Sequence, residues 1–299
     1  MEKEPTFVEA FLDNLRYERA LSQATIDGYQ GDLEAFESFF KALDNGLTWD
    51  NIDRDVAREW VVHLMEKGQK PTSVKRRLSA LRSFYKFLLR RGLVQHDPVH
   101  NITSPKAERP LPAFIREDDM ARLLDSEDTF DSTFEGIRDR LIITMFYETG
   151  IRLSELTGLR LCDVNTSAQT IKVRGKGNKE RIVPFGEALL HLINIYADAR
   201  EGQPGADGEL LFLSRHGQRM RPQVVRKMIK AKLALVTDQR KRSPHVLRHS
   251  FATAMLNHDA HLESVKELLG HEKLSTTEIY THTSLEELRR VYNDAHPRA

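Results

Sequence analysis

The sequence predicts a mainly α-helical protein with one small β-hairpin, divided into two domains. Apolar residues recur at the three- and four-residue spacing of amphipathic helices along most of the chain. Alternation of apolar and polar residues flanks one short Gly-Lys-Gly-Asn segment. A stretch with three prolines, residues 101–112, separates the first hundred residues from the remainder. We therefore expect an N-terminal domain over residues 1–100, a linker over 101–112 and a C-terminal domain over 113–299.

The amino-acid composition limits the classes of protein to which this chain can belong. Apolar residues make up 40% of the chain and charged residues 30%, which is typical of a soluble globular protein. No run of about eighteen apolar residues occurs, and the N-terminus is charged, so we expect a cytoplasmic protein without membrane attachment. Cys162 is the only cysteine, which excludes an internal disulfide and a cysteine zinc cluster, and its surroundings predict burial. The net charge of +1 means that a nucleic-acid site must come from local clustering.

Four helices are predicted in the first domain. Thr6 and Glu9 have the spacing of a capping box at the start of the first helix. The third and fourth helices end at Gly68 and Gly92, because glycine is favoured just past a helix C-terminus. The apolar residues that repeat at helical spacing and form the predicted core are Tyr29, Leu33, Phe36, Phe40, Val56, Trp60, Leu64, Leu78, Leu81, Tyr85 and Leu88.

The fourth helix, over about residues 72–91, also has a cationic face. No acidic residue occurs over residues 74–91. A charge run is usually a solvated surface, but an unbalanced cationic stripe in a nearly neutral protein is better explained by contact with a DNA backbone. A second cationic surface surrounds a predicted helix over 222–235, where DNA contact and a solvated face are both open. The predicted DNA-binding residues are Lys75, Arg76, Arg82, Lys86, Arg221 and Arg226.

The second domain begins with a helix over about residues 117–124 and a longer helix that ends at Gly150. Ser154 is expected to cap the next short helix, so that Arg152 lies on a tight turn with its guanidinium projecting.

A β-hairpin is predicted over residues 170–185, with Lys176 and Lys179 at its tip. These lysines fit a solvated tip and a cationic finger in a DNA groove equally well. A helix over 187–200 and a strand over 210–214 are expected to follow.

A phosphate site is predicted where the next helix begins. Ser243 is expected to cap this helix and Pro244 to be its first residue, so His245 and Arg248 share one face near its N-terminus. Free N–H groups and a guanidinium fork there favour an anion. His245 and His249 also have the spacing of two zinc ligands, but no Glu follows His245 and Arg248 would repel a cation. No metal is therefore expected.

Two further short helices follow. One, over about residues 261–269, stops at Gly270, and His271 comes next. Ser275 then opens a helix that would hold Tyr280 one turn inside it. From these residues alone, the two short helices around Gly270 also fit a helix-turn-helix regulator that binds DNA without chemistry.

Five segments in this order resemble the tyrosine recombinase (phage integrase) family and its Xer subfamily: TGIRLSEL, GKGNKER, HVLRHSFAT, LLGH and TTEIYTH. The resemblance covers essentially the whole chain, and the terminal AHPRA is closer to the XerC branch than to the XerD branch. It implies an N-terminal core-binding (SAM-like) domain and an α+β catalytic domain that form a clamp on DNA. The catalytic residues that it implies are Arg152, Lys176, His245, Arg248, His271 and Tyr280, with Glu155 as the acid that supports the first arginine.

The resemblance also implies the chemistry. Tyr280 would attack phosphorus and form a 3′-phosphotyrosyl ester, while Arg152 and Arg248 grip the non-bridging oxygens. Lys176 would protonate the leaving 5′ oxygen, and no metal or cofactor is needed.

The implied partners follow from strand exchange between two duplexes. They are double-stranded DNA, three further protomers in a tetramer, possible sister recombinases of the XerD kind, and a septal DNA translocase. Chromosome dimer resolution at a dif-type site is the expected role, and an integrase of a phage or mobile element or a type IB topoisomerase are the enzymatic alternatives. In the family the closing helix docks on a neighbour; Leu285, Leu288 and Tyr292 could do this, or pack on their own domain.

Overall fold

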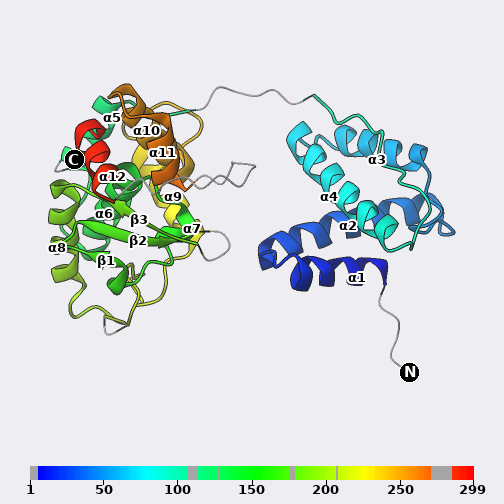
Figure 1. Ribbon diagram of the computed structural model, residues 1–299, viewed down its shortest axis with the longest axis horizontal. Coiled ribbons are helices and arrows are strands. Elements are labelled where there is room, and N and C mark those ends of the chain that lie inside the picture. Colours follow the sequence, from blue (N-terminus) through cyan, green and yellow to red (C-terminus); the bar gives the residue numbers. More distant parts are fainter. Residues whose placement is uncertain (1–5, 107–112, 127, 176–178, 207, 271–284) are drawn as a thin grey trace. The chain divides into compact units, whose positions relative to one another are not determined.

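The structure is a computed structural model of residues 1–299, and it describes all of them except 1–5, 107–112, 127, 176–178, 207 and 271–284 (Figure 1). The chain divides into two compact units, Met1–Pro110 and Leu111–Ala299. This division falls inside the stretch predicted as a linker. Each unit has an apolar core of its own. None of the helices that the structure describes combines the length and the apolar character that crossing a lipid bilayer requires.

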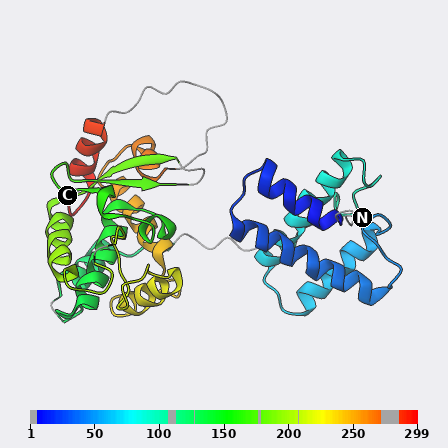
Figure 2. The same cartoon turned by 90° about the horizontal axis from the view of Figure 1, so that it is seen from below.

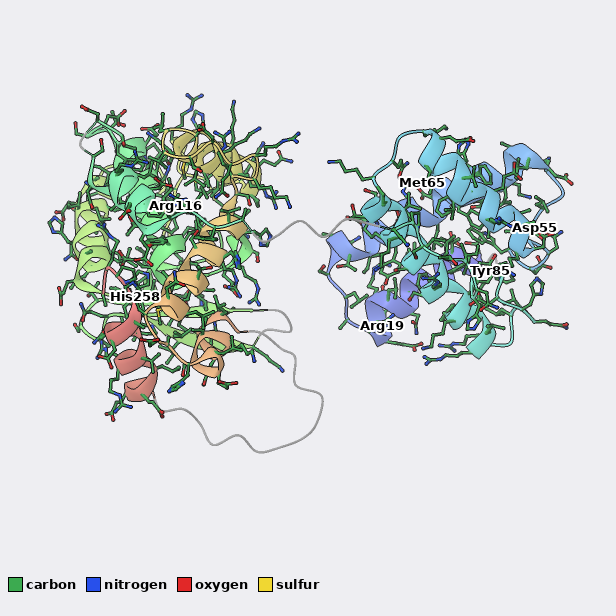
Figure 3. All side chains as sticks on the ribbon, turned by 90° about the horizontal axis from the view of Figure 1, so that it is seen from above. Arg19, Asp55, Met65, Tyr85, Arg116 and His258 are labelled. Atoms are coloured by element: carbon green, nitrogen blue, oxygen red, sulfur yellow. The ribbon has the colours of Figure 1, made fainter. Side chains whose placement is uncertain are left out.

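The described part of the N-terminal unit is helical. The predicted capping box is present, because Thr6 Oγ1 accepts a hydrogen bond from Glu9 N at 3.2 Å and Glu9 Oε2 accepts one from Thr6 N at 2.8 Å. Figure 3 shows Tyr85 among these helices, where its hydroxyl donates to Trp49 O at 3.0 Å. All the predicted core residues are buried except Tyr29 and Val56, which are partly buried. The elements are α1 (Phe7–Asp13), the π-helical turn η1 (Asn14–Glu18), α2 (Gln23–Leu43), α3 (Arg54–Glu66) and α4 (Pro71–Arg90).

Helix α6 (Phe134–Thr149) lies at the centre of the C-terminal unit, packed against α8 (Glu187–Arg200) and α10 (Pro244–Asn257). It ends at Gly150 as predicted, with a left-handed φ of 58°. A Cβ atom there would lie 2.5 Å from Phe251 Cδ1, so both the backbone conformation and the packing require glycine.

A three-stranded antiparallel sheet in the order β1-β2-β3 lies beside these helices (Figures 1 and 2). The predicted hairpin is confirmed, because Ile171 pairs with Val183 and Arg174 with Glu180. The remaining elements of this unit are α5 (Glu117–Asp125), α7 (Leu153–Leu156), the 3-10 turn η2 (Leu161–Asp163), β1 (Val164–Asn165), β2 (Thr170–Arg174), β3 (Glu180–Pro184), α9 (Pro222–Leu233), α11 (Leu262–Leu269) and α12 (Leu285–Ala295).

Two local predictions in this unit are wrong. Residues 210–214 do not form a strand, because Leu210 and Leu213 make only isolated bridges, with Arg160 and Arg219 respectively. Cys162 is exposed rather than buried. It lies in the η2 turn, where Asp163 takes the buried position and accepts a hydrogen bond from Arg160 N at 2.9 Å. The turn thus directs its aspartate inward and its cysteine outward.

The C-terminal helix and tail pack on their own unit. Leu288 and Tyr292 are buried in the same core as α6, and the Tyr292 ring stacks on His296 with 5.1 Å between centroids. His296 Nε2 lies 3.3 Å from Tyr147 O, and Arg298 binds Asp125 through both terminal nitrogens. For Leu288 and Tyr292 the structure therefore shows the second of the two predicted uses. The Leu285 side chain lies outside the description.

Candidate active site

Arg248 lies at the centre of the candidate site. Its side chain is buried on α10, and its terminal nitrogens donate to Gly150 O and, at 2.6 Å, to Leu269 O. These carbonyl groups belong to the C-terminal ends of α6 and α11, where helices leave acceptors without internal donors. Burial, followed by repulsion from Arg152 and Arg181, lowers the pKa of Arg248 to about 10. The guanidinium is therefore still charged at neutral pH.

Helix α10 begins where it was predicted to begin, but the predicted capping hydrogen bond is absent. Ser243 is the N-cap residue and Pro244 follows it, yet the Ser243 side chain makes no capping hydrogen bond. The φ of Ser243 is −157°. Ser22 also makes no capping hydrogen bond, although its φ of −65° is close to that of the capping residue Thr6, so the backbone angle alone does not decide the cap.

Four residues that were predicted to take part in catalysis or DNA binding line one small pocket. Arg152, His245 and Arg248 line it together with Arg226, which was predicted to bind DNA. Its volume is about 40 Å³. Pockets for drug-sized ligands measure roughly 300–1,000 Å³, so this one fits a single small group and not a nucleobase. Three guanidinium groups and an exposed imidazole around such a volume suit a phosphate. The other residues that line the pocket are Ile151, Leu153, Ser243 and Pro244.

Arg152 is the N-cap residue of α7, and Ser154 lies inside this helix, so the predicted cap is wrong by two positions. Glu155 does the capping from the third helical position: its Oε2 accepts from Arg152 N at 2.7 Å. The other carboxylate oxygen, Oε1, accepts from Arg152 Nη1 at 2.9 Å. Arg152 Nη2 donates to Gly270 O, also at 2.9 Å. The carboxylate therefore fixes both the backbone and the side chain of Arg152.

Arg181 is a further member of the site to which the sequence reasoning gave no role. It lies on β3 and donates from Nη1 to Glu155 Oε1 at 2.8 Å and from Nη2 to Glu155 Oε2 at 3.0 Å. Its Nε donates to Leu268 O at 2.9 Å. Strand alternation was the available signal, since Arg181 lies two residues before the buried Val183 and between the more exposed Glu180 and Ile182.

Glu155 remains ionised inside this cluster. Only 1% of its side chain is exposed. Burial raises its pKa, but the hydrogen bonds from Arg181 and Arg152 outweigh burial and bring the pKa to about 2. The three arginines Arg152, Arg181 and Arg248 with this one carboxylate leave an excess of two positive charges among these four side chains. Such an arrangement favours binding of an anion.

The comparisons with known proteins identify the family. The model of the phage integrase family matches residues 113–287, and that of the phage integrase N-terminal SAM-like domain matches residues 8–92. The chain is 37% identical to the tyrosine recombinase XerD of Staphylococcus aureus, over 98% of this chain and 99% of that protein. This chain belongs to the phage integrase, or tyrosine recombinase, family. It is therefore a DNA strand-exchange recombinase, as its resemblance implied.

Other relatives agree with this membership. The recombinase is 36% identical to the tyrosine recombinase XerC of Chlorobaculum tepidum, over 97% of this chain and 94% of that protein. Its fold is similar to the crystal structure of the XerH recombinase bound to a palindromic difH substrate, with a TM-score of 0.71, 23% identity and coverage of 96% and 80%. Because XerD and XerC match at nearly equal identity, assignment of the recombinase to the XerC branch stays a prediction.

Three predicted catalytic residues, Lys176, His271 and Tyr280, lie outside the described residues, as do Ser275 and Glu278, which would open the helix around the tyrosine. Their roles in the recombinase stay predictions. Among the residues that are described, no group of three His, Cys, Asp or Glu side chains is arranged to hold a metal ion.

The predicted DNA-binding residues of the recombinase differ in how they are engaged. Lys75 and Lys86 on α4, and Arg221 and Arg226 at α9, are exposed. Arg76 makes a two-pronged contact with the buried Asp32, and Arg82 donates to the backbone carbonyls of Val99 and Ile102.

Arg82 and Lys86 also line a cleft of about 530 Å³ in the N-terminal unit. The chain around it contributes Phe11, Asn14, Glu18, Arg19, Ser83, Phe87, Arg90 and Arg91. Most of the polar side chains that line the cleft are basic, which suits the phosphates of a nucleic-acid backbone.

Proposed function

We propose that this recombinase cuts and rejoins double-stranded DNA at a specific site through a 3′-phosphotyrosyl bond to Tyr280. The observation that carries the proposal is the pocket in which Arg152, Arg248 and His245 converge beside an ionised Glu155. A phosphodiester is anionic and repels nucleophiles, so a site that cleaves it must neutralise this charge and then stabilise a more highly charged transition state. Fixed guanidinium groups supply that stabilisation.

The reaction is a balanced transesterification. The Tyr280 oxygen forms a bond to phosphorus while the bond from phosphorus to the 5′ oxygen breaks. Lys176 gives a proton to this leaving oxygen, and His245 and His271 supply hydrogen bonds and assist proton movement. A free phenol has a pKa of about 10, and nearby cations favour its deprotonated form. A 5′ hydroxyl from another duplex can reverse the step, so religation needs no external energy source and no cofactor.

The cellular role that we propose is resolution of chromosome dimers at a dif-type site during cell division, in the cytoplasm. The XerD and XerC relatives support this role, and the XerH complex supports recognition of a dif-type DNA by a recombinase of this fold. Residues 1–100 would be the core-binding domain and 113–299 the catalytic domain. Four protomers would act on two duplexes, either alone or with a sister recombinase and a septal translocase.

The test is covalent capture on a nicked duplex that carries a dif-type site. The protein is incubated with the labelled duplex, alone and with a sister recombinase, then denatured and separated by electrophoresis. We expect a protein–DNA adduct that Tyr280→Phe abolishes. Tyr17→Phe, at a tyrosine that is 75% exposed in the other unit, is the matched control and should retain the adduct. Binding without an adduct in every combination would instead support a regulator that performs no chemistry, and supercoil relaxation without a specific site would support a topoisomerase.

A further inference from the structure

We infer that Arg181 is a positioning residue of the recombination site, which holds Glu155 and thereby Arg152, and ties the β2–β3 hairpin to the end of α11. The inference rests on the proposed function, because it assigns a role within the same site. Arg181 does not line the phosphate-sized pocket, whereas Arg152 and Arg248 do. It therefore acts through its neighbours and does not touch the scissile phosphate.

Every nitrogen of the Arg181 guanidinium has a defined acceptor. Two bonds of 2.8 and 3.0 Å go to the two oxygens of Glu155, and one of 2.9 Å goes to Leu268 O. Glu155 in turn receives two bonds from Arg152. Removal of Arg181 would leave a carboxylate that is 1% exposed with only half of these four donors. A buried charge that loses half of its donors either recruits a proton or moves, and both outcomes weaken the hold of Glu155 on Arg152.

Arg181 also joins two chain segments that carry predicted reaction groups. Lys176 lies five residues before Arg181 in the sequence. The acceptor Leu268 lies three residues before His271. One guanidinium thus sets the position of β3 relative to the C-terminal end of α11. The packing is close, since a Cβ atom at Gly270 would lie 3.1 Å from Arg181 Cδ and Nη1.

The bidentate geometry distinguishes Arg181 from a simple positive charge. A planar guanidinium can bind both oxygens of Glu155 and still donate to a carbonyl group, whereas a lysine ammonium is a point charge without this fork. Arg181→Lys should therefore restore part of the electrostatic effect but not the link to α11. Arg181→Gln should lose both.

The first experiment separates binding from cleavage. Single-turnover cleavage of the nicked dif-type duplex is measured at saturating DNA, together with the Kd for the same DNA, for wild type, Arg181→Gln and Arg181→Lys. We expect the cleavage rate of Arg181→Gln to fall by about 10- to 100-fold, with Arg181→Lys in between and the Kd changed less than about threefold. Arg174→Gln is the matched control: Arg174 lies on the same hairpin, binds Glu180 at 2.9 Å and should keep the wild-type rate. Rates for Arg181→Gln within about twofold of wild type, in a protein that melts normally, would overturn the inference.

A double-mutant cycle and a titration keep the inference testable by independent means. If Arg181 acts through Glu155, Arg181→Gln combined with Glu155→Gln should be no slower than the slower single variant. In ¹³C NMR of labelled glutamates, Glu155 of wild type should stay ionised down to about pH 4, and Arg181→Gln should begin to titrate it above that pH. Additive rate losses, or an unchanged titration of Glu155, would contradict the assignment. If wild type forms no adduct the proposed function fails, and the titration still decides the role of Arg181.

Discussion

Glu155 and Glu148, two glutamates of the C-terminal unit on either side of Gly150, are both buried but differ in charge. Glu155 accepts hydrogen bonds from two arginines, and its pKa falls to about 2 despite burial. Neither carboxylate oxygen of Glu148 has a hydrogen-bond partner among the described residues, and Arg298 Nε lies 3.6 Å away. Burial raises the pKa of Glu148 to about 8, which Arg298 only partly offsets. The difference shows that hydrogen-bond donors and nearby cations can outweigh the effect of burial on the pKa of a carboxyl group, which burial alone would raise.

The two regions therefore use a carboxyl group in different ways. The candidate active site contains a fixed negative charge that orients cations toward a small pocket. The contact between α6 and the C-terminal tail contains an acid that is largely neutral at pH 7 and also a neutral histidine, His296, whose pKa burial lowers to about 3.

The largest effect is expected from Arg248→Ala in the candidate active site, the region whose buried glutamate is charged. Cleavage of the nicked duplex should fall by at least about 10²- to 10³-fold, because a donor to the transition state is lost. The melting temperature should also fall, since Gly150 O and Leu269 O lose their donor. Arg122→Ala, at an exposed arginine of α5, is the control for both measurements. Retention of more than a tenth of the wild-type rate would remove Arg248 from the site.

Replacement of each acid by its neutral isostere tests the comparison directly. Glu155→Gln should destabilise the protein by about 2–4 kcal/mol in urea unfolding at pH 7, because two arginines lose a buried counter-ion. Glu148→Gln should instead raise the free energy of unfolding at pH 7, because glutamine resembles the neutral acid and does not have to take up a proton on folding. Glu148→Gln should also keep cleavage activity. Equal losses in the two variants would show that the two acids do not differ in charge.

The pH dependence of stability should separate the same two groups. The folded-state pKa of Glu148, about 8, lies above the value of 4.5 for an exposed glutamate, so its contribution to stability is present below pH 4.5 and is lost as the pH rises through 8. His296 behaves in the opposite sense: its folded pKa of about 3 lies below 6.5, so stability is lost as the pH falls below 6.5. The free energy of unfolding of wild type should decline when it is measured from pH 6 to 9, and this decline should be weaker in Glu148→Gln. Parallel curves for the two proteins would contradict this.

A smaller effect should distinguish two kinds of basic residue in the N-terminal unit. Lys86 is exposed, whereas Arg82 donates hydrogen bonds within the protein. Lys86→Ala should weaken binding to the dif-type duplex and reduce the slope of log K against log salt by about 0.9, with an unchanged melting temperature. Arg82→Ala should instead lower stability by about 1 kcal/mol, because the carbonyl groups of Val99 and Ile102 lose a donor. Binding isotherms at several salt concentrations and thermal melts measure both effects. An unchanged salt slope in Lys86→Ala would exclude a phosphate contact at this position.

The smallest effect concerns Cys162. Since this thiol is exposed, it should react with an alkylating reagent in the folded protein. Mass spectrometry would follow the reaction, and cleavage rate and melting temperature should change little. Protection of the thiol until the protein is denatured would restore the original prediction of burial.

The sequence predicted well those features that depend on near neighbours. The capping box at Thr6, the end of α6 at Gly150 and the hairpin all follow from spacing within a few residues. Arg152 and Arg248, which short motifs predicted to act together, line the same pocket. Arg181 was missed because its acceptors, Glu155 and Leu268, lie 26 and 87 residues away in the chain.

Errors arose where tertiary contacts replaced a local preference. Ser154 has the side chain of a good cap, but Glu155 satisfies the free N–H of Arg152 instead. Residues 210–214 have the composition of a strand, but no continuous partner strand lies beside them in the described part of this unit. Local motifs thus predicted which groups react, while long-range hydrogen bonds determine how Arg152 and Arg248 are held.

The arginines of the site donate to the last carbonyl groups of α6 and α11, and this affects how an inert copy of the recombinase should be made. A substitution at Arg152 or Arg248 removes a helix-end donor along with a charge, so it alters the shape of the protein as well as its chemistry. Such variants are poor inert copies for DNA-binding studies. Tyr280→Phe removes only the proposed nucleophile, leaves the arginine donors to both helix ends in the sequence, and is the better change for binding experiments without cleavage.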